Sequence, residues 1–199
     1  MSLELEFEIP TWEEIYELLL SLADKIRKES FKPDIIVGVS RGGWAPARIM
    51  SDLLENPELA NVKAEFYLGV AETKGEPIIT QPVSMSVHGK RVLVVDDVAD
   101  TGKSLHLVRL HLMEKGATEV KIATLYYKPW SILAPDYYER KTSSWIIFPW
   151  ERKETVRKVI ERYKRQGKSV EEAKQKLVVS GMDRRLVEHF LKEISEGKT

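Results

Sequence analysis

The residues best suited to chemistry lie in one run, from Val92 to Ser104. Its sequence is VLVVDDVADTGKS: four aliphatic residues, then Asp96 and Asp97, then a turn of small residues that leads into a helical pattern as far as about Glu114. The aliphatic residues predict a buried parallel strand that ends at the two acids, and open α/β sheets bind ligands at the carboxyl ends of such strands. Backbone amides at a helix start suit phosphate, and carboxylates suit hydroxyls or a metal ion. The run therefore predicts a site for a phosphorylated sugar.

The run has two simpler interpretations, a nucleotide-triphosphate P-loop and a capped turn. Gly102-Lys103-Ser104 resembles the end of a nucleotide-triphosphate P-loop, G-x-x-x-x-G-K-[ST], but that pattern requires glycine where this chain has Asp97, whose carboxylate would point into the phosphate cradle. The two adjacent acids could also merely cap a turn, yet together with Asp100 they carry more negative charge than a cap requires. Asp100 and Thr101 could be N-cap residues of the following helix, which is compatible with a chemical role.

A second loop has a similar form. Residues 34–39 (DIIVGV) predict a buried strand that runs into the turn Ser40–Gly43, and a helix begins near Trp44. The two glycines of the turn allow close approach of a ligand to the backbone, or a positive φ. Arg41 adds a fixed positive charge that suits phosphate oxygens. Alone, this could be an ordinary strand–helix turn with a surface arginine; beside the first loop, it indicates a second phosphate-binding turn.

The first run resembles the ribose-phosphate-binding signature of the type I phosphoribosyltransferases. That signature is two hydrophobic pairs, two acids and then x-x-[DE]-T-G-x-[ST], and the run from Val92 to Ser104 matches every position. Members of this family use 5-phosphoribosyl 1-pyrophosphate (PRPP) and Mg²⁺ to attach a ribose phosphate to a nitrogenous base. The resemblance implies an α/β fold with a central, mostly parallel sheet, flanked by helices and carrying a small hood.

The resemblance also implies how PRPP binds. Asp96 and Asp97 would hold the ribose hydroxyls or the metal. The 5-phosphate would be bound by Ala99, Asp100, Thr101, Gly102, Lys103 and Ser104. The pyrophosphate would be bound by Ser40, Arg41, Gly42 and Gly43, and in the family the Ser-Arg peptide bond of this loop is often cis.

Two further segments resemble the purine-specific branch of the family. A strand pattern at 121–127 ends at Lys128, and residues 145–151 have the sequence WIIFPWE, an arrangement similar to the xanthine–guanine and hypoxanthine–guanine phosphoribosyltransferases and closest to the short xanthine–guanine type. The resemblance implies that Lys128 bonds the purine O6, since an ammonium suits a carbonyl. Trp145 would stack on the ring, for which an aromatic face is suited, and Ile146 would bond the base through its backbone.

Two acids complete the set of roles that the resemblance implies. Asp100 would act as general acid or base at the purine N7, a role that a carboxylate within hydrogen-bond reach of a ring nitrogen can fill. Glu151 would bind metal or the group at the purine C2. Trp150 is expected to pack in the core or at an interface instead.

Composition limits the class of protein. The chain has 199 residues, 31 basic and 31 acidic side chains, and no cysteine. The length suits one α/β domain with a small addition, the balanced charge offers nucleic acid no broad basic field, and the lack of cysteine excludes disulfides and thiolate chemistry. No run approaches 18 apolar residues, and the acidic N-terminus does not resemble a signal peptide. We expect a soluble, cytoplasmic protein with neither a nucleic-acid nor a membrane partner.

The chain is predicted to have two parts: a phosphoribosyltransferase domain over residues 1–151 and a small helical extension over 152–199. Three amphipathic helices are expected at 154–166, 169–180 and 183–194, with a capping box at Ser169 and Glu172 and an N-cap at Asp183. Fewer than ~50 residues make a marginal independent fold, so the extension should pack on the main domain or on a neighbouring subunit. Within the first part, residues 71–81 lie where the family has a mobile lid, although an exposed hairpin would have the same composition.

The function that these features favour is purine salvage. The predicted reaction converts a 6-oxopurine base and PRPP to the nucleoside 5′-monophosphate and pyrophosphate, with Mg²⁺ as cofactor, in a homodimer or homotetramer. The alternative is a non-catalytic regulator that senses PRPP and uses residues 154–194 as its output module. Asp100, Lys128 and Trp145 disfavour this alternative, because a PRPP sensor does not need the purine-binding set.

Overall fold

The computed structural model describes residues 6–56, 58–67 and 75–196. The chain divides into two compact units. The sheet unit comprises residues 15–143, and the helical unit comprises residues 1–14 and 144–199. The domain boundary predicted after residue 151 separates two parts by their ability to fold independently, which these units do not test, so it stays a prediction.

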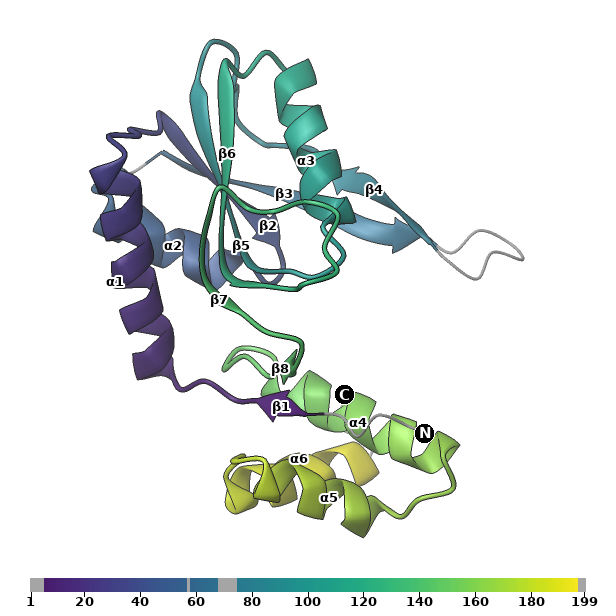
Figure 1. Ribbon diagram of the computed structural model, residues 1–199. Helices are drawn as coiled ribbons and strands as arrows, with labels where there is room; N and C mark the ends of the chain where they lie inside the picture. The colour runs from purple at the N-terminus through teal and green to yellow at the C-terminus, as the bar shows by residue number, and fades with distance from the viewer. Residues whose placement is uncertain (1–5, 57, 68–74, 197–199) are drawn as a thin grey trace. The chain divides into compact units, whose positions relative to one another are not determined.

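The sheet unit is built on a six-stranded sheet in the order β4-β3-β2-β5-β6-β7 (Figure 1). Its strands are β2 (Ile35–Ser40), β3 (Leu59–Tyr67), β4 (Glu76–Gln81), β5 (Arg91–Ala99), β6 (Glu119–Tyr127) and β7 (Tyr137–Lys141). All neighbouring pairs are parallel except β3 and β4, which form an antiparallel pair. The predicted mostly parallel sheet is therefore confirmed. Part of the 71–81 segment is β4, and its residues 71–74 lie outside the described residues.

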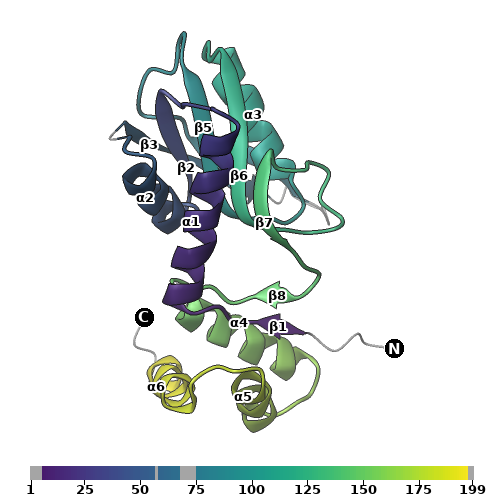
Figure 2. The same cartoon turned by 60° about the vertical axis from the view of Figure 1, so that its left-hand side comes forward.

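Helices flank the sheet on both faces. Helices α1 (Trp12–Lys28) and α2 (Trp44–Leu53) cover one face, and α3 (Lys103–Glu114) covers the other (Figures 1 and 2). The inward face of α1 buries an apolar stripe at helical spacing, composed of Ile15, Leu19, Leu22, Ala23 and Ile26. Because both faces of the sheet are covered, the central strands are apolar along their length, as the sequence of β2 shows.

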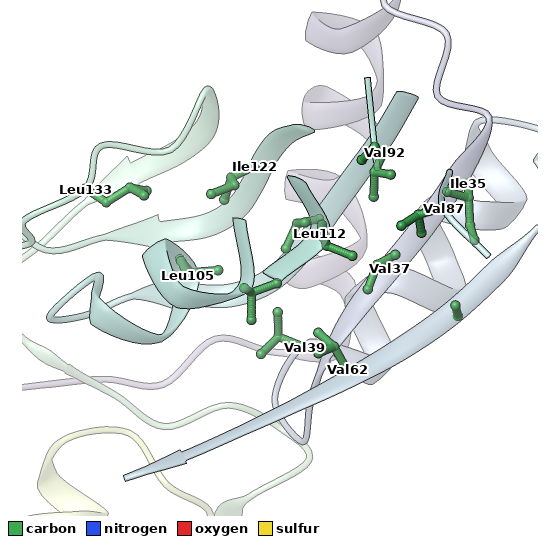
Figure 3. Packing of buried hydrophobic residues seen from close by; sticks show 14 of the residues in the cluster. Ile35, Val37, Val39, Val62, Val87, Val92, Leu105, Leu112, Ile122 and Leu133 are labelled. Carbon is green, nitrogen blue, oxygen red and sulfur yellow. The ribbon is translucent and has the colours of Figure 1, made fainter. Parts of the chain in front are cut away.

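One hydrophobic core of the sheet unit lies between the sheet and α3. Strands β2 and β5 contribute alternate residues to it, and α3 contributes one side (Figure 3); its members include Ile35, Val37, Val39, Val92, Val94, Leu105, Val108 and Leu112. Burying one such side chain contributes about 1.5–3 kcal/mol, so this cluster holds the strands firmly. The loops that follow β2 and β5 are thereby anchored at a rigid edge.

The helical unit has its own small core. Strand β1 (Phe7–Glu8) pairs in parallel with β8 (Trp145–Ile146), and three helices follow: α4 (Arg152–Arg165), α5 (Val170–Val179) and α6 (Arg184–Ser195). The predicted starts of α5 and α6 are confirmed, because Ser169 and Glu172 form a capping box and the Asp183 carboxylate accepts a bond from the Leu186 amide at 2.9 Å. Helix α4 begins at Arg152, ahead of the start predicted at 154. The buried members of the core are Ile147, Val156, Val159, Ile160, Ala173, Leu177, Met182 and Val187.

No helix in the described part of the chain is both long and apolar enough to cross a membrane.

Candidate active site

The two adjacent acids lie inside a strand, not after it. Strand β5 continues beyond the aliphatic run as far as Ala99, and its residues Val98 and Ala99 still pair with β6. The expectation that the strand ends at Asp96 and Asp97 is wrong, because β6 extends alongside these residues and supplies ladder partners. Side chains alternate along a strand, so the two carboxylates point to opposite faces of the sheet.

The environment of the acid pair favours a cation. The Asp97 amide donates to Asp96 Oδ1 at 3.0 Å, and the Asp97 side chain is buried. Burial, and then the neighbouring charge of Asp97, raise the pKa of Asp96 well above its ordinary value. A cation beside the pair would offset the free-energy cost of holding two negative charges in a buried place.

The carboxylates of Asp96 and Asp97 suit Mg²⁺ as part of its ligand shell. The ion commonly binds through one or two protein carboxylates and completes its shell with water and substrate phosphate oxygens. Because Asp96 and Asp97 leave the strand on opposite faces, one of them at a time can supply such a carboxylate, and the described residues contain no cluster of three or more His, Cys, Asp or Glu side chains that could hold a metal. These residues therefore suit a metal that arrives with a phosphate-bearing ligand.

The turn after β5 depends on Gly102. This residue is the N-cap of α3 and has φ 77°, so the interpretation of Asp100 or Thr101 as the N-cap residue is wrong, although the Thr101 hydroxyl accepts a long bond of 3.4 Å from the Lys103 amide. A Cβ on Gly102 would lie 2.4 Å from Ser131 Oγ and 2.8 Å from the Leu133 amide nitrogen. Both the backbone angle and the close packing thus require glycine. The first amides of α3 have no intrahelical acceptor and can serve a phosphate.

The turn after β2 packs directly on the acid pair. A Cβ on Gly42 would lie 2.1 Å from Asp97 Oδ2, and a Cβ on Gly43 would lie 2.4 Å from the carbonyl oxygen of Val95. The Gly43 amide donates to the Val39 carbonyl at 2.8 Å, which closes the turn before α2. The structure therefore brings the two predicted loops together through glycines that leave no room for a side chain.

The charged residue of this turn, Arg41, is exposed. The Ser40–Arg41 peptide bond is cis, as the resemblance implies.

A third loop, residues 128–133, is hydrogen-bonded to the predicted phosphate turn, residues 99–104. The Lys128 amide donates to the Ala99 carbonyl and the Ile132 amide donates to the Thr101 carbonyl, both at 3.0 Å. Lys128 itself is only 5% exposed, which is rare for a lysine and keeps its ammonium in a fixed place. The predicted base-binding lysine and the predicted phosphate turn thus belong to one hydrogen-bonded assembly.

Trp130 is a residue that the sequence analysis missed. Its indole Nε1 donates to Asp100 Oδ1 at 2.9 Å, and the Lys128 Nζ lies 5.5 Å from the centre of its ring. It therefore contacts both of the sheet-unit residues that were predicted to act on the base. The only sequence signal was its position two residues after Lys128, which no pattern marks as functional.

The remaining predicted residues belong to the helical unit. Trp145 and Ile146 form β8, with Trp145 41% exposed and Ile146 buried, and Glu151 is the N-cap residue of α4. Their roles toward the base and the metal stay predictions. Trp150 packs on Phe148 with ring centres 4.9 Å apart, which agrees with the packing role expected for it.

Comparison with known proteins decides the family. Residues 8–157 match the model of the phosphoribosyl transferase domain family. The chain is a phosphoribosyltransferase. Residues 158–199 lie outside the family match, so α5, α6 and the end of α4 are additions to it.

The relatives of this phosphoribosyltransferase are purine enzymes. The xanthine-guanine phosphoribosyltransferase of Gluconobacter oxydans is 29% identical over 143 residues, which cover 71% of this chain and 82% of that protein. Its counterpart in Idiomarina loihiensis is 31% identical over 144 residues, with 71% and 84% covered. A purine phosphoribosyltransferase from Pyrococcus horikoshii, known from its crystal structure, is 42% identical, has a TM-score of 0.66, and is matched over 72% of this chain and 93% of that one. The predicted family and its purine branch are thereby confirmed.

Proposed function

We propose that the protein converts a 6-oxopurine base and PRPP to the nucleoside 5′-monophosphate and pyrophosphate. The observation that carries this proposal is the assembly of three loops around Asp97 and Asp100: the turn 99–104, the turn Ser40–Gly43 and the loop 128–133. Relatives named xanthine-guanine and hypoxanthine-guanine phosphoribosyltransferases support the choice of base. No observation favours the PRPP-sensing regulator.

In this proposal the sheet unit binds both the 5-phosphate and the pyrophosphate of PRPP. The amides of residues 99–104 bind the 5-phosphate, and Ser40–Gly43 bind the pyrophosphate, with the Arg41 guanidinium as counter-charge. Asp96 and Asp97 hold the ribose hydroxyls or the water ligands of Mg²⁺. When bound, the metal supplies positive charge that stabilises the negative charge developing on the departing pyrophosphate.

Two residues of the sheet unit act on the base. The Lys128 ammonium has three donors and no acceptor, so it selects a carbonyl at C6 over an amine. The bond from Trp130 occupies Asp100 Oδ1 and leaves the other oxygen to take the N7 proton, as N9 bonds to C1 and pyrophosphate leaves C1. Trp145, Ile146 and Glu151 are further proposed contacts of the base or metal, carried over from the resemblance.

A panel assay tests this function. The purified protein is mixed with PRPP, Mg²⁺ and, in separate reactions, hypoxanthine, guanine, xanthine, adenine, uracil or orotate. We expect nucleoside monophosphate from one or more of the first three bases and little from the others, because only those three present a C6 carbonyl on a purine ring. Excess chelator should abolish turnover. Equal use of adenine would contradict the role of Lys128, and PRPP binding without turnover of any base would favour the regulator.

The homodimeric or homotetrameric state, the cytoplasmic location and the boundary between residues 151 and 152 also belong to this proposal. Light scattering on the purified protein tests the first, with a monomer as the contradicting result. Truncation after Glu151 tests the boundary, because an independent first domain should keep PRPP binding.

A further inference from the structure

Lys103, the first residue of α3, lies at the end of a helix that does not favour a cation. The aligned peptide dipoles make a helix N-terminus positive, so acidic side chains are stabilising there and basic ones are not. Helix α3 has no acidic residue in its first turn, and its N-cap residue, Gly102, has no side chain that could cap it. The ammonium of Lys103 therefore adds positive charge to a helix end that needs an anion.

The structure supplies this anion from a distant element. The Lys103 Nζ donates to Glu76 Oε1 at 2.5 Å, although Glu76 precedes Lys103 by 27 positions in the chain. Glu76 is the first residue of β4, where it is the register partner of Tyr67 in the antiparallel pair with β3. Both ends of the ion pair belong to the sheet unit, in which α3 lies beside β4 (Figure 1). The β3–β4 pair thus brings a carboxylate to the N-terminus of α3.

A phosphate group at residues 99–104 would be a stronger partner for Lys103 than Glu76 is. It carries about two negative charges and three acceptor oxygens, and it would also accept bonds from the first amides of α3. The ion pair is weaker, because the side chains of Lys103 and Glu76 are 33% and 70% exposed, and exposed ion pairs contribute little. Because a carboxylate and a phosphate repel each other, the two anions would compete for the ammonium.

We propose that Glu76 sets the affinity of the 5-phosphate turn by competing with phosphate for Lys103. The carboxylate and the 5-phosphate are alternative partners of this ammonium, so a phosphate that binds the amides of residues 99–104 displaces Glu76. Glu76 touches neither the base nor the reacting atoms, and it acts on PRPP binding only through Lys103. This inference rests on the proposed function, because it takes residues 99–104 as the 5-phosphate site.

Ribose 5-phosphate is the probe for this competition, because it carries the 5-phosphate without the pyrophosphate that Ser40–Gly43 would bind. Its dissociation constant is measured by isothermal titration calorimetry on the full-length protein. Glu76→Gln should bind ribose 5-phosphate about two- to fivefold more tightly, since Lys103 no longer has a charged partner to give up. Lys103→Gln should bind it about tenfold more weakly, since a charge-assisted bond to the phosphate is lost.

The double variant Glu76→Gln/Lys103→Gln separates competition from a general effect of charge. It should bind ribose 5-phosphate as weakly as Lys103→Gln does, because Glu76 has no influence once its partner is gone. Glu65→Gln is the matched control: Glu65 is an exposed carboxylate of the neighbouring strand β3 that pairs with Lys63 at 2.9 Å, so its substitution should leave the affinity unchanged. Glu76 and Glu65 are both exposed, so these variants should fold, and circular dichroism checks this.

Three results would overturn the inference. Unchanged affinity in Glu76→Gln would mean that the ion pair has no bearing on phosphate binding. Weaker binding in Glu76→Gln would mean that Glu76 holds Lys103 in place for the phosphate and does not compete with it. Equal tightening with and without Lys103 would mean that only the removed negative charge matters. Failure of the native protein to bind either ribose 5-phosphate or PRPP is a distinct result, which would refute the proposed 5-phosphate site and this inference with it.

Discussion

Substituting Gly42 by alanine should damage PRPP binding by moving Asp97. The new Cβ would lie 2.1 Å from Asp97 Oδ2, 2.6 Å from Cγ and 2.9 Å from Oδ1, so the whole carboxylate is in its way. An ordinary contact needs about 3.5 Å, so the two groups must separate by more than about 1 Å. Asp97 is only 8% exposed and has little free space, so it cannot rotate away without disturbing its neighbours. A misplacement of about 1 Å in a binding group can cost about 10²-fold.

We therefore expect Gly42→Ala to weaken PRPP binding in the presence of Mg²⁺ by about 10²-fold, measured by calorimetry. Gly89→Ala is the matched control, because it has φ 72° and nothing within 4 Å of its Cβ. It should cost about 1–2 kcal/mol of unfolding free energy for the left-handed backbone, yet leave PRPP affinity unchanged. A folded Gly42→Ala protein that binds PRPP as the native protein does would refute the argument that the two loops form one site.

Three further substitutions test separate parts of the account. Asp100→Asn cannot accept a proton, so turnover should fall by about 10²–10⁴-fold while PRPP affinity changes little; near-native turnover would remove Asp100 from the chemistry. Lys128→Ala should raise the Michaelis constant for guanine or hypoxanthine far more than that for PRPP, and equal effects on the two would mean that the lysine does not bind the base. The backbone amide, Nε and Nη2 of Arg91 bond the Asp34 carboxylate at 2.8–3.1 Å and hold the pKa of Asp34 at about 2, below its ordinary 3.8. The ion pair therefore stabilises the folded protein above about pH 4, and this stabilisation is lost as the pH falls toward 2. Because the pair is exposed, Asp34→Asn should lower the free energy of unfolding by about 1 kcal/mol at pH 7 and by almost nothing near pH 2. Equal stability of the variant and the native protein in thermal unfolding at pH 7 would count against this prediction.

The positions of the turns after β2 and β5 could be predicted because their signals are local. A run of aliphatic residues, two acids and closely spaced glycines define a strand and a tight turn within about a dozen residues. The aliphatic runs predicted buried parallel strands, and the family resemblance implied the mostly parallel sheet. Capping residues predicted the helix starts at positions such as Asp183.

The features that sequence reasoning missed depend on distant partners. Strand β5 reaches Ala99 only because β6 lies alongside it, and β7 is a polar edge strand with the sequence YYERK, which lacks the usual apolar alternation. The bond from Trp130 to Asp100 joins residues thirty positions apart, and no local pattern encodes it.

The central claim is that one bound PRPP and one bound purine become one nucleotide at the loops around Asp97 and Asp100. The most direct measurement is the stoichiometry of products from guanine, PRPP and Mg²⁺, with mass spectrometry for the nucleotide and an enzymatic assay for pyrophosphate. The account predicts equal amounts of guanosine 5′-monophosphate and pyrophosphate, formed only when base, PRPP and metal are all present, and strongly reduced in Asp100→Asn. Pyrophosphate release that does not depend on the base, or PRPP binding with no nucleotide formed, would contradict it.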